Sequence, residues 1–317
     1  MRSSEITQPL AFEPIFMERI WGGRRLKSKF RKKLPPDAQI GESWEIVDRP
    51  GAQSIVWNGP LRGETLHELW TQHRQEIFGD VPATARFPLV AKLIDARAKL
   101  SLQVHPPSRV AKALGGEMKD EIWYVLDAVP DAQIYAGLRS GVTREQFGAA
   151  LENSTVAELV HRISVKRGDA IFMPSGRLHT MGDGILVAEI QQNSDTTYRV
   201  FDWNRVGTDG EPRRLHVREA MQSIDFTDIE PDLIQPRRET LVSDSAFVVE
   251  KWDLISEREA APLGKFAILL CLNGEIDCAG LKFKQGDFFL VPGTLQDRNL
   301  HPRGADTSLL RTMLPEL

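Results

Sequence analysis

The chain has little of several features that often decide a protein's class. Only two of its 317 residues are cysteines, Cys271 and Cys278, which excludes a disulfide framework and a zinc site built from thiolates. The longest strongly apolar stretch, residues 266–272, is far shorter than the roughly 20 residues of a membrane-spanning helix. The first residues lack the continuous apolar run of a signal peptide. We therefore expect a soluble, cytoplasmic protein.

A strong charge of either sign is also absent. The chain has 40 Lys and Arg against 44 Asp and Glu, for a formal net charge of −4, so no general basic field favours nucleic acid or membrane surfaces. There is no Gly-x4-Gly-Lys-Ser/Thr loop, so nucleotide binding has no support. The 41% hydrophobic and 26% charged content is that of an ordinary globular protein. We expect neither nucleic acid nor membrane as a partner, and the sequence does not predict an oligomeric state.

Short apolar runs bounded by Gly, Pro, Asn and Asp dominate what is present, and they predict antiparallel β structure. The clearest runs are residues 122–126, 169–173, 185–191, 266–272 and 287–291.

Three segments predict helices instead, at residues 65–78, 143–156 and 216–224. The first two begin with the spacing of a capping box, Thr65 with Glu68 and Thr143 with Gln146. These helices do not alternate regularly with strands, which argues against a doubly wound parallel sheet. We expect a mainly β fold with a few appended helices.

One motif occurs twice and suggests two related β-barrel halves. Residues 168–176 read GDAIFMPSG, and residues 286–293 read GDFFLVPG. Each copy predicts a turn, a short strand and a second turn. Residues 229–238, with two prolines and several charges, are the expected junction. The predicted domains are residues 1–232, which would carry the chemistry, and residues 233–317.

The densest polar cluster is predicted on a strand that contains Ser101, Gln103 and His105. Because side chains alternate along a strand, all three point to one face. Such a face does not suit an apolar core, because every buried polar group needs a partner. A solvent-facing strand edge is the alternative. Glu121 opens an apolar strand, where its carboxylate would face either a metal or water.

His179 has a more specific context. The spacing of Gly168, Pro174, Gly176 and His179 resembles the second sequence signature of the cupin β-barrels. The C-terminal copy has Asp297 at the equivalent spacing and no histidine. We therefore expect two cupin-like, jelly-roll halves, of which only the first binds metal.

Four residues together form a candidate ligand set with nitrogen donors, oxygen donors and one carboxylate: Gln103, His105, Glu121 and His179. Such a set suits zinc or another first-row divalent ion. With no thiolate, the site need not be a closed structural one.

These blocks, in this order, resemble the type I mannose-6-phosphate isomerases, in particular their short bacterial form. The resemblance covers roughly the first 225 residues well. The blocks that carry it are PIF at 14–16, RIWGG at 19–23, GESWE at 41–45, KLIDA at 92–96, LSLQVHP at 100–106, EIWYV at 121–125 and EIQQNSDTTYRVFD at 189–202.

The resemblance implies a role for each matching residue. It implies one zinc ion per chain, held by the four ligand candidates. It implies mannose 6-phosphate and fructose 6-phosphate as substrates, Arg199 as catalytic, and Ser101 and Lys119 near the substrate phosphate. Lys92, Glu189 and Asp195 match other polar cavity positions. One departure is Arg177, which stands where a small residue is common, and another is Pro107, where the family usually has Asp.

Chemistry leaves other readings open. Interconverting an aldose and a ketose moves a proton between C1 and C2 through an enediol, and a metal and a fixed cation both suit that task. The general base could be Glu189, Lys92, His105, Asp195 or a metal-bound water. Arg199 could instead form a structural ion pair with Asp195. A cupin-type Fe(II) oxygenase and a non-catalytic sugar-phosphate-binding paralogue are the alternative functions.

Overall fold

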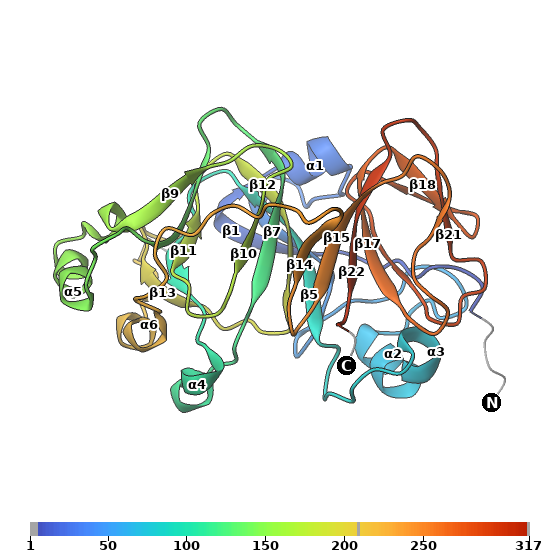
Figure 1. Cartoon of the computed structure of the whole chain (residues 1–317), viewed down its shortest axis with the longest axis horizontal. Coiled ribbons are helices and arrows are strands. Elements are labelled where there is room, and N and C mark those ends of the chain that lie inside the picture. The colour runs from blue at the N-terminus through green and yellow to red at the C-terminus, as the bar shows by residue number, and fades with distance from the viewer. Residues whose placement is uncertain (1–5, 208–209, 316–317) are drawn as a thin grey trace.

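The computed structural model describes residues 6–207 and 210–315 and shows two β-sandwiches side by side (Figure 1). Each sandwich pairs two antiparallel sheets that stay open at their edges. The fold is therefore mainly β with two jelly-roll halves, as the sequence predicts.

The N-terminal sandwich contains a six-stranded and a five-stranded sheet. The six-stranded sheet has, in spatial order, β1 (Ile15–Gly23), β2 (Ile40–Ile46), β5 (Leu89–Ala96), β12 (Ile185–Gln192), β7 (Glu121–Ala128) and β10 (Ala170–Met173). The five-stranded sheet has β13 (Tyr198–Phe201), β6 (Leu102–Val104), β11 (His179–Met181), β8 (Gln133–Leu138) and β9 (Val160–Ser164). A small hairpin pairs β3 (Asp48–Arg49) with β4 (Ala52–Gln53).

The C-terminal sandwich repeats this plan with fewer strands. Its larger sheet has β14 (Thr240–Ser243), β15 (Val248–Asp253), β22 (Ser308–Met313), β17 (Ala267–Asn273) and β20 (Phe288–Val291). The smaller sheet has β16 (Arg258–Glu259), β21 (Asn299–Pro302), β18 (Glu275–Cys278) and β19 (Leu281–Lys284).

The largest apolar core lies where the two sandwiches meet. Leu93 and Ile190 of the six-stranded sheet share this core with Leu270 and Leu310 of the C-terminal sheet. Every residue of β5 is therefore buried, because one face of this strand packs on the C-terminal sandwich and the other faces the interior of its own sandwich. A buried rigid strand is a good platform for a functional site.

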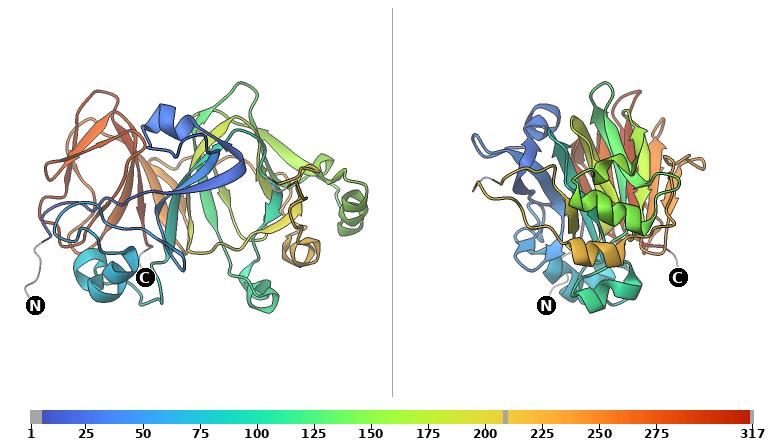
Figure 2. Two further views of the ribbon diagram at one scale, coloured as in Figure 1. Left: turned by 180° about the vertical axis from the view of Figure 1, so that it is seen from behind. Right: turned by 90° about the vertical axis from the view of Figure 1, so that its left-hand side faces the viewer.

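Short helices lie at the edges of the sandwiches (Figure 2): α1 (Arg25–Phe30), α2 (Leu66–Gln72), α3 (Arg74–Phe78), α4 (Ser108–Ala111), α5 (Arg144–Glu152) and α6 (Val217–Ser223), with 3-10 turns at Lys112–Leu114 and Val156–Glu158. Both predicted capping boxes are present, before α2 and α5. The predicted helix at 65–78 is wrong in one respect, since it divides at His73, which ends α2 and begins α3. In the described residues no helix is long and apolar enough to cross a membrane.

The repeated motif forms equivalent turns in the two sandwiches. Gly168 and Gly286 both have positive φ, 94° and 86°, a region in which a side chain is strained. The next residue in each copy, Asp169 or Asp287, accepts a hydrogen bond from the backbone three residues earlier. The domain limits at 232 and 233 stay a prediction, and residues 1–5 and 316–317 of those domains lie outside the described residues.

Candidate metal centre and active site

Strand register aligns three of the predicted site residues. Gln103 of β6 pairs with His179 of β11 on one side and with Arg199 of β13 on the other. Paired residues of neighbouring strands point to the same face of a sheet. Gln103, His179 and Arg199 therefore form one row on the five-stranded sheet, although up to 96 positions separate them in sequence.

A second row crosses the opposite sheet. Lys92 of β5 pairs with Trp44 on one side and with Glu189 of β12 on the other, and Glu189 pairs in turn with Trp123 of β7. Glu121 opens β7 and pairs with Gln191. The two sheets of the sandwich thus bring the predicted residues together from opposite sides.

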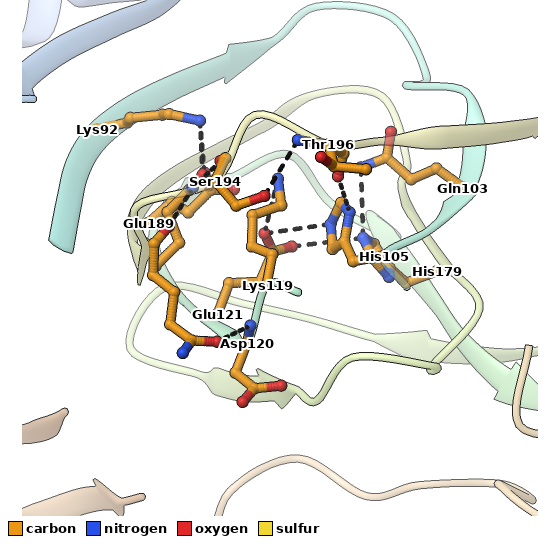
Figure 3. Close-up of polar contacts among 12 residues, drawn as sticks. Lys92, Gln103, His105, Lys119, Asp120, Glu121, His179, Glu189, Ser194 and Thr196 are labelled. Carbon is orange, nitrogen blue, oxygen red and sulfur yellow. Dashed lines mark hydrogen bonds and ion pairs between the residues drawn. The ribbon is translucent and has the colours of Figure 1, made fainter. Parts of the chain in front are cut away.

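The centre of the site is a buried cluster of His105, Glu121 and His179 (Figure 3). Each is at most 1% exposed, and their candidate ligand atoms lie within 4.8 Å of one another. Nε2 of each histidine is 3.4 Å from an oxygen of Glu121. Two donors bound at about 2.0 Å to one tetrahedral ion lie roughly 3.3 Å apart, so this spacing fits a shared metal.

The unpartnered atoms of the cluster also fit a metal. Nε2 of His105 and both oxygens of Glu121 are buried without a hydrogen-bond partner among the described residues. Buried polar atoms without partners are rare and costly. A divalent cation would satisfy all three at once, so these three residues could hold a metal ion.

Backbone carbonyls orient both histidines. Nδ1 of His105 lies 2.9 Å from the carbonyl oxygen of Thr196, and Nδ1 of His179 lies 2.9 Å from that of Arg177. A carbonyl can only accept, so each Nδ1 carries the proton and each Nε2 presents a lone pair to the cluster.

Burial sets the charge state of the cluster. Burial, followed by the nearby Lys119 ammonium, lowers the pKa of His105 to about 3, and burial also lowers the pKa of His179. Burial alone would raise the pKa of Glu121, but Lys119, 3.5 Å away, and His105 outweigh it and lower that pKa. At neutral pH the cluster thus holds two neutral imidazoles and one carboxylate, the protonation states that bind metal.

Gln103 lies next to this cluster as the predicted fourth ligand. Its side-chain amide nitrogen is 3.3 Å from Nε2 of His179, and its amide oxygen is 3.4 Å from the hydroxyl of Ser101. A half-turn of the amide exchanges these two atoms and directs the oxygen to the cluster.

A cavity of about 470 Å³ opens beside the cluster. It is lined by seven of the predicted site residues: Lys92, Ser101, Gln103, Lys119, Glu189, Asp195 and Arg199. The other three predicted residues form the buried cluster, which lies next to Gln103 and Lys119. All ten predicted residues therefore lie in one region.

Lys92 and Glu189 form a buried ion pair in the cavity wall. Their Nζ and Oε1 atoms are 3.1 Å apart, and the indole of Trp123 donates a 2.8 Å hydrogen bond to Oε2 of Glu189. Burial raises the pKa of Glu189, and Lys92 opposes that rise. Burial would lower the pKa of Lys92, but Glu189 and Glu42 outweigh it, so Lys92 stays protonated.

Arg199 has no carboxylate partner among the described residues. Its Nη1 donates to the carbonyl of Arg214 at 2.8 Å, and its buried Nε has no partner. The alternative of an Arg199–Asp195 ion pair is wrong, because no such pair forms within residues 6–207 and 210–315. The two residues also do not share a strand, since β13 begins at Tyr198. Asp195 is exposed where it lines the cavity.

The sequence analysis missed four charged residues of the cavity wall: Glu18, Arg19, Glu42 and Arg213. Glu42 accepts hydrogen bonds from Arg19 at 2.7 Å and from the indole of Trp44 at 2.6 Å. Arg213 forms a bidentate pair with Asp202. Glu42 and Arg19 lie in the family-like blocks GESWE and RIWGG, which was the available signal, whereas nothing local marks Arg213.

Arg177, the departure noted in the sequence, has a structural explanation. Its guanidinium forms two hydrogen bonds with Asp228, at 2.8 and 2.7 Å, and a third with the carbonyl of Phe172. These contacts fix the turn whose carbonyl orients His179. Arg177 therefore does not obstruct the cluster.

Comparisons with known proteins agree with this geometry. The family described as "Phosphomannose isomerase type I, catalytic domain" matches residues 10–131. Mannose-6-phosphate isomerase ManA of Bacillus subtilis (strain 168) is 37% identical over 300 residues, covering 90% of this chain and 93% of that protein. The probable mannose-6-phosphate isomerase GmuF of the same organism is 38% identical over 301 residues, covering 90% and 94%.

A solved structure extends the similarity to the fold. The crystal structure of the mannose 6-phosphate isomerase from Bacillus subtilis superimposes with a TM-score of 0.85 at 34% identity, covering 96% of this chain and 99% of that one. The resemblance found in the sequence is confirmed over both sandwiches. This chain belongs to the type I phosphomannose isomerase family.

Proposed function

We propose that this protein is a metal-dependent isomerase that interconverts mannose 6-phosphate and fructose 6-phosphate. The observation that carries the proposal is the buried His105–Glu121–His179 cluster, with its unpartnered donor atoms, beside a cavity lined by cations. The near full-length similarity to mannose-6-phosphate isomerases supports the choice of substrate. A small sugar phosphate as the partner also favours a cytoplasmic location.

Zinc is the proposed metal, one ion per chain, with Gln103 as the fourth ligand beside the cluster. Two imidazoles, a carboxylate and an amide oxygen suit this ion. When bound, the ion would act as a Lewis acid that polarises the sugar oxygens. All proposed ligands lie in residues 1–232, and the C-terminal copy of the motif has Asp297 where the first copy has His179. This supports a catalytic domain of residues 1–232 and a metal-free domain of residues 233–317.

Arg199, Glu189, Lys92 and Asp195 are the proposed catalytic residues. The permanently charged guanidinium of Arg199 has no carboxylate to neutralise it, so it would stabilise the negative charge that develops on the enediolate. Burial raises the pKa of Glu189, so this carboxylate takes up a proton more readily than an exposed one does. This property suits a group that accepts the proton from one of C1 and C2 and returns it to the other. Lys92 holds this carboxylate in place at 3.1 Å.

Ser101 and Lys119 are the proposed contacts to the substrate phosphate. Both line the cavity and both are 4% exposed. A hydroxyl and an ammonium can together bind a dianion. Asp195, at the exposed side of the cavity, is available to orient a sugar hydroxyl.

The test is metal analysis combined with an isomerase assay on one purified sample. We expect about one zinc per chain, conversion of mannose 6-phosphate to fructose 6-phosphate, and loss of activity on chelation with recovery on adding zinc. Iron in the sample with oxygen consumption would favour the Fe(II) oxygenase. Sugar-phosphate binding without turnover would favour the non-catalytic paralogue.

A further inference from the structure

A short segment before α6 runs alongside Arg199. The backbone N–H of His216 donates to the carbonyl of Arg199 at 2.7 Å, and the backbone N–H of Arg199 donates to Nδ1 of the His216 ring at 3.2 Å. The third contact is the bond from Nη1 of Arg199 to the carbonyl of Arg214 at 2.8 Å. Residues 214–216 thus contact Arg199 at its carbonyl, its amide and its guanidinium.

One hydrogen bond orients the Arg199 side chain in residues 6–207 and 210–315, the bond from Nη1 to the Arg214 carbonyl, whereas the two bonds with His216 fix the Arg199 backbone. Its Nε is buried without a partner, and Asp202 is already paired with Arg205 and Arg213. A long side chain with no ion pair keeps many rotamers unless neighbouring groups select one. The carbonyl of Arg214, in the segment 214–216, is the neighbouring group that selects one rotamer of Arg199.

The His216 ring can accept only while Nδ1 carries no proton. Four groups face or adjoin this ring: the cations Arg199 and Arg214, the carboxylate of Glu219 on α6, and the ring of Tyr198, whose centroid is 6.1 Å away. Burial and the two arginines lower the pKa of His216, and Glu219 opposes them. The ring is therefore neutral at physiological pH and retains its acceptor.

We propose that His216 is a positioning residue for the reaction: its Nδ1 and the adjoining Arg214 carbonyl hold Arg199 with its guanidinium facing the cavity. The inference rests on the proposed function, since it assumes that the Arg199 charge acts on the substrate. A preorganised cation stabilises a transition state without having to move during the reaction. Loss of the acceptor would leave the cation present but less well placed.

The test compares two substitutions in the full-length, metal-loaded protein. His216→Ala removes the acceptor, and we expect kcat to fall roughly threefold to tenfold, as the loss of one hydrogen bond implies, with KM and metal content unchanged. His216→Asn offers an amide oxygen in the place of Nδ1, so it should recover most of kcat. Gln222→Ala, on the exposed face of the adjoining helix α6, is the matched control and should behave as wild type.

A double-mutant cycle with Arg199→Ala separates this inference from the function itself. If His216 acts through Arg199, adding His216→Ala to Arg199→Ala should lower kcat no further. Additive losses, or equal losses for His216→Ala and His216→Asn, would overturn the positioning role. A lower melting temperature with kcat unchanged would show that His216 is merely structural. An active Arg199→Ala variant would instead contradict the proposed function of Arg199.

Discussion

Two buried neutral histidines should make the metal-free protein sensitive to mild acid. The pKa of His105 is about 3 in the folded chain, against 6.5 for the free side chain. Between these values the unfolded chain binds a proton that the folded chain does not. Above pH 6.5 the His105 ring is neutral in both states, so it does not alter the pH dependence of the free energy of unfolding. As the pH falls from 6.5 toward 3, that free energy decreases.

The size of this loss follows from linkage. One such histidine lowers the free energy of unfolding by about 1.4 kcal/mol per pH unit inside the window. The pKa of His179 is shifted in the same direction, so it adds to the slope. Glu121, whose pKa is lowered from 4.5, loses its contribution only below that value. The range from pH 6.5 to 5 therefore lies above the window of Glu121.

The assay is urea unfolding of the chelator-treated protein at four pH values between 6.5 and 5, followed by tryptophan fluorescence. His105→Gln replaces the titrating ring with a neutral amide, so its slope should be smaller by about 1.4 kcal/mol per pH unit. His301→Gln, at a half-buried position of β21 away from the cluster, is the matched control for a histidine-to-glutamine exchange. Equal slopes for wild type and His105→Gln would refute the reasoning, because His105 would then carry its proton in the folded chain.

Substitutions at three proposed site positions, His179, Lys119 and Arg199, test the proposed roles. His179→Ala removes a buried donor, so bound metal and activity should fall together, while Asp297→Ala in the C-terminal sandwich should leave metal content unchanged; normal metal content in the first variant would exclude His179 as a ligand. Lys119→Ala should raise KM for the phosphorylated sugar, because a phosphate contact acts in the ground state and in the transition state alike. The variant should retain the metal, because removing a cation beside Glu121 does not weaken the attraction of Glu121 for a divalent ion. A drop in kcat alone would place Lys119 at the reacting carbons. Arg199→Ala should cost on the order of 3 kcal/mol at the transition state, roughly a hundredfold in kcat, and Arg199→Lys should not restore full activity because it lacks the planar fork. A folded, metal-loaded Ala variant within a few fold of wild type would assign Arg199 a structural role.

The sequence by itself determined the local features of this protein. Alternation and turn residues marked the strands around β7, β12 and β17, because strand periodicity is written in neighbouring residues. Thr65 and Thr143 marked the helix starts, because a capping box spans only four positions. The residue types of the metal cluster were also predictable, since His and Glu offer the donors that divalent ions take.

The tertiary structure alone decided how these residues combine. The row of Gln103, His179 and Arg199 depends on strand register, which long-range pairing and a buried face fix together. The same holds for the absence of an Arg199–Asp195 pair and for the contact between Arg199 and His216, because a side chain's partners depend on how whole sheets and helices pack. Local sequence sets which groups a strand can offer, and only the packed fold sets which of them meet.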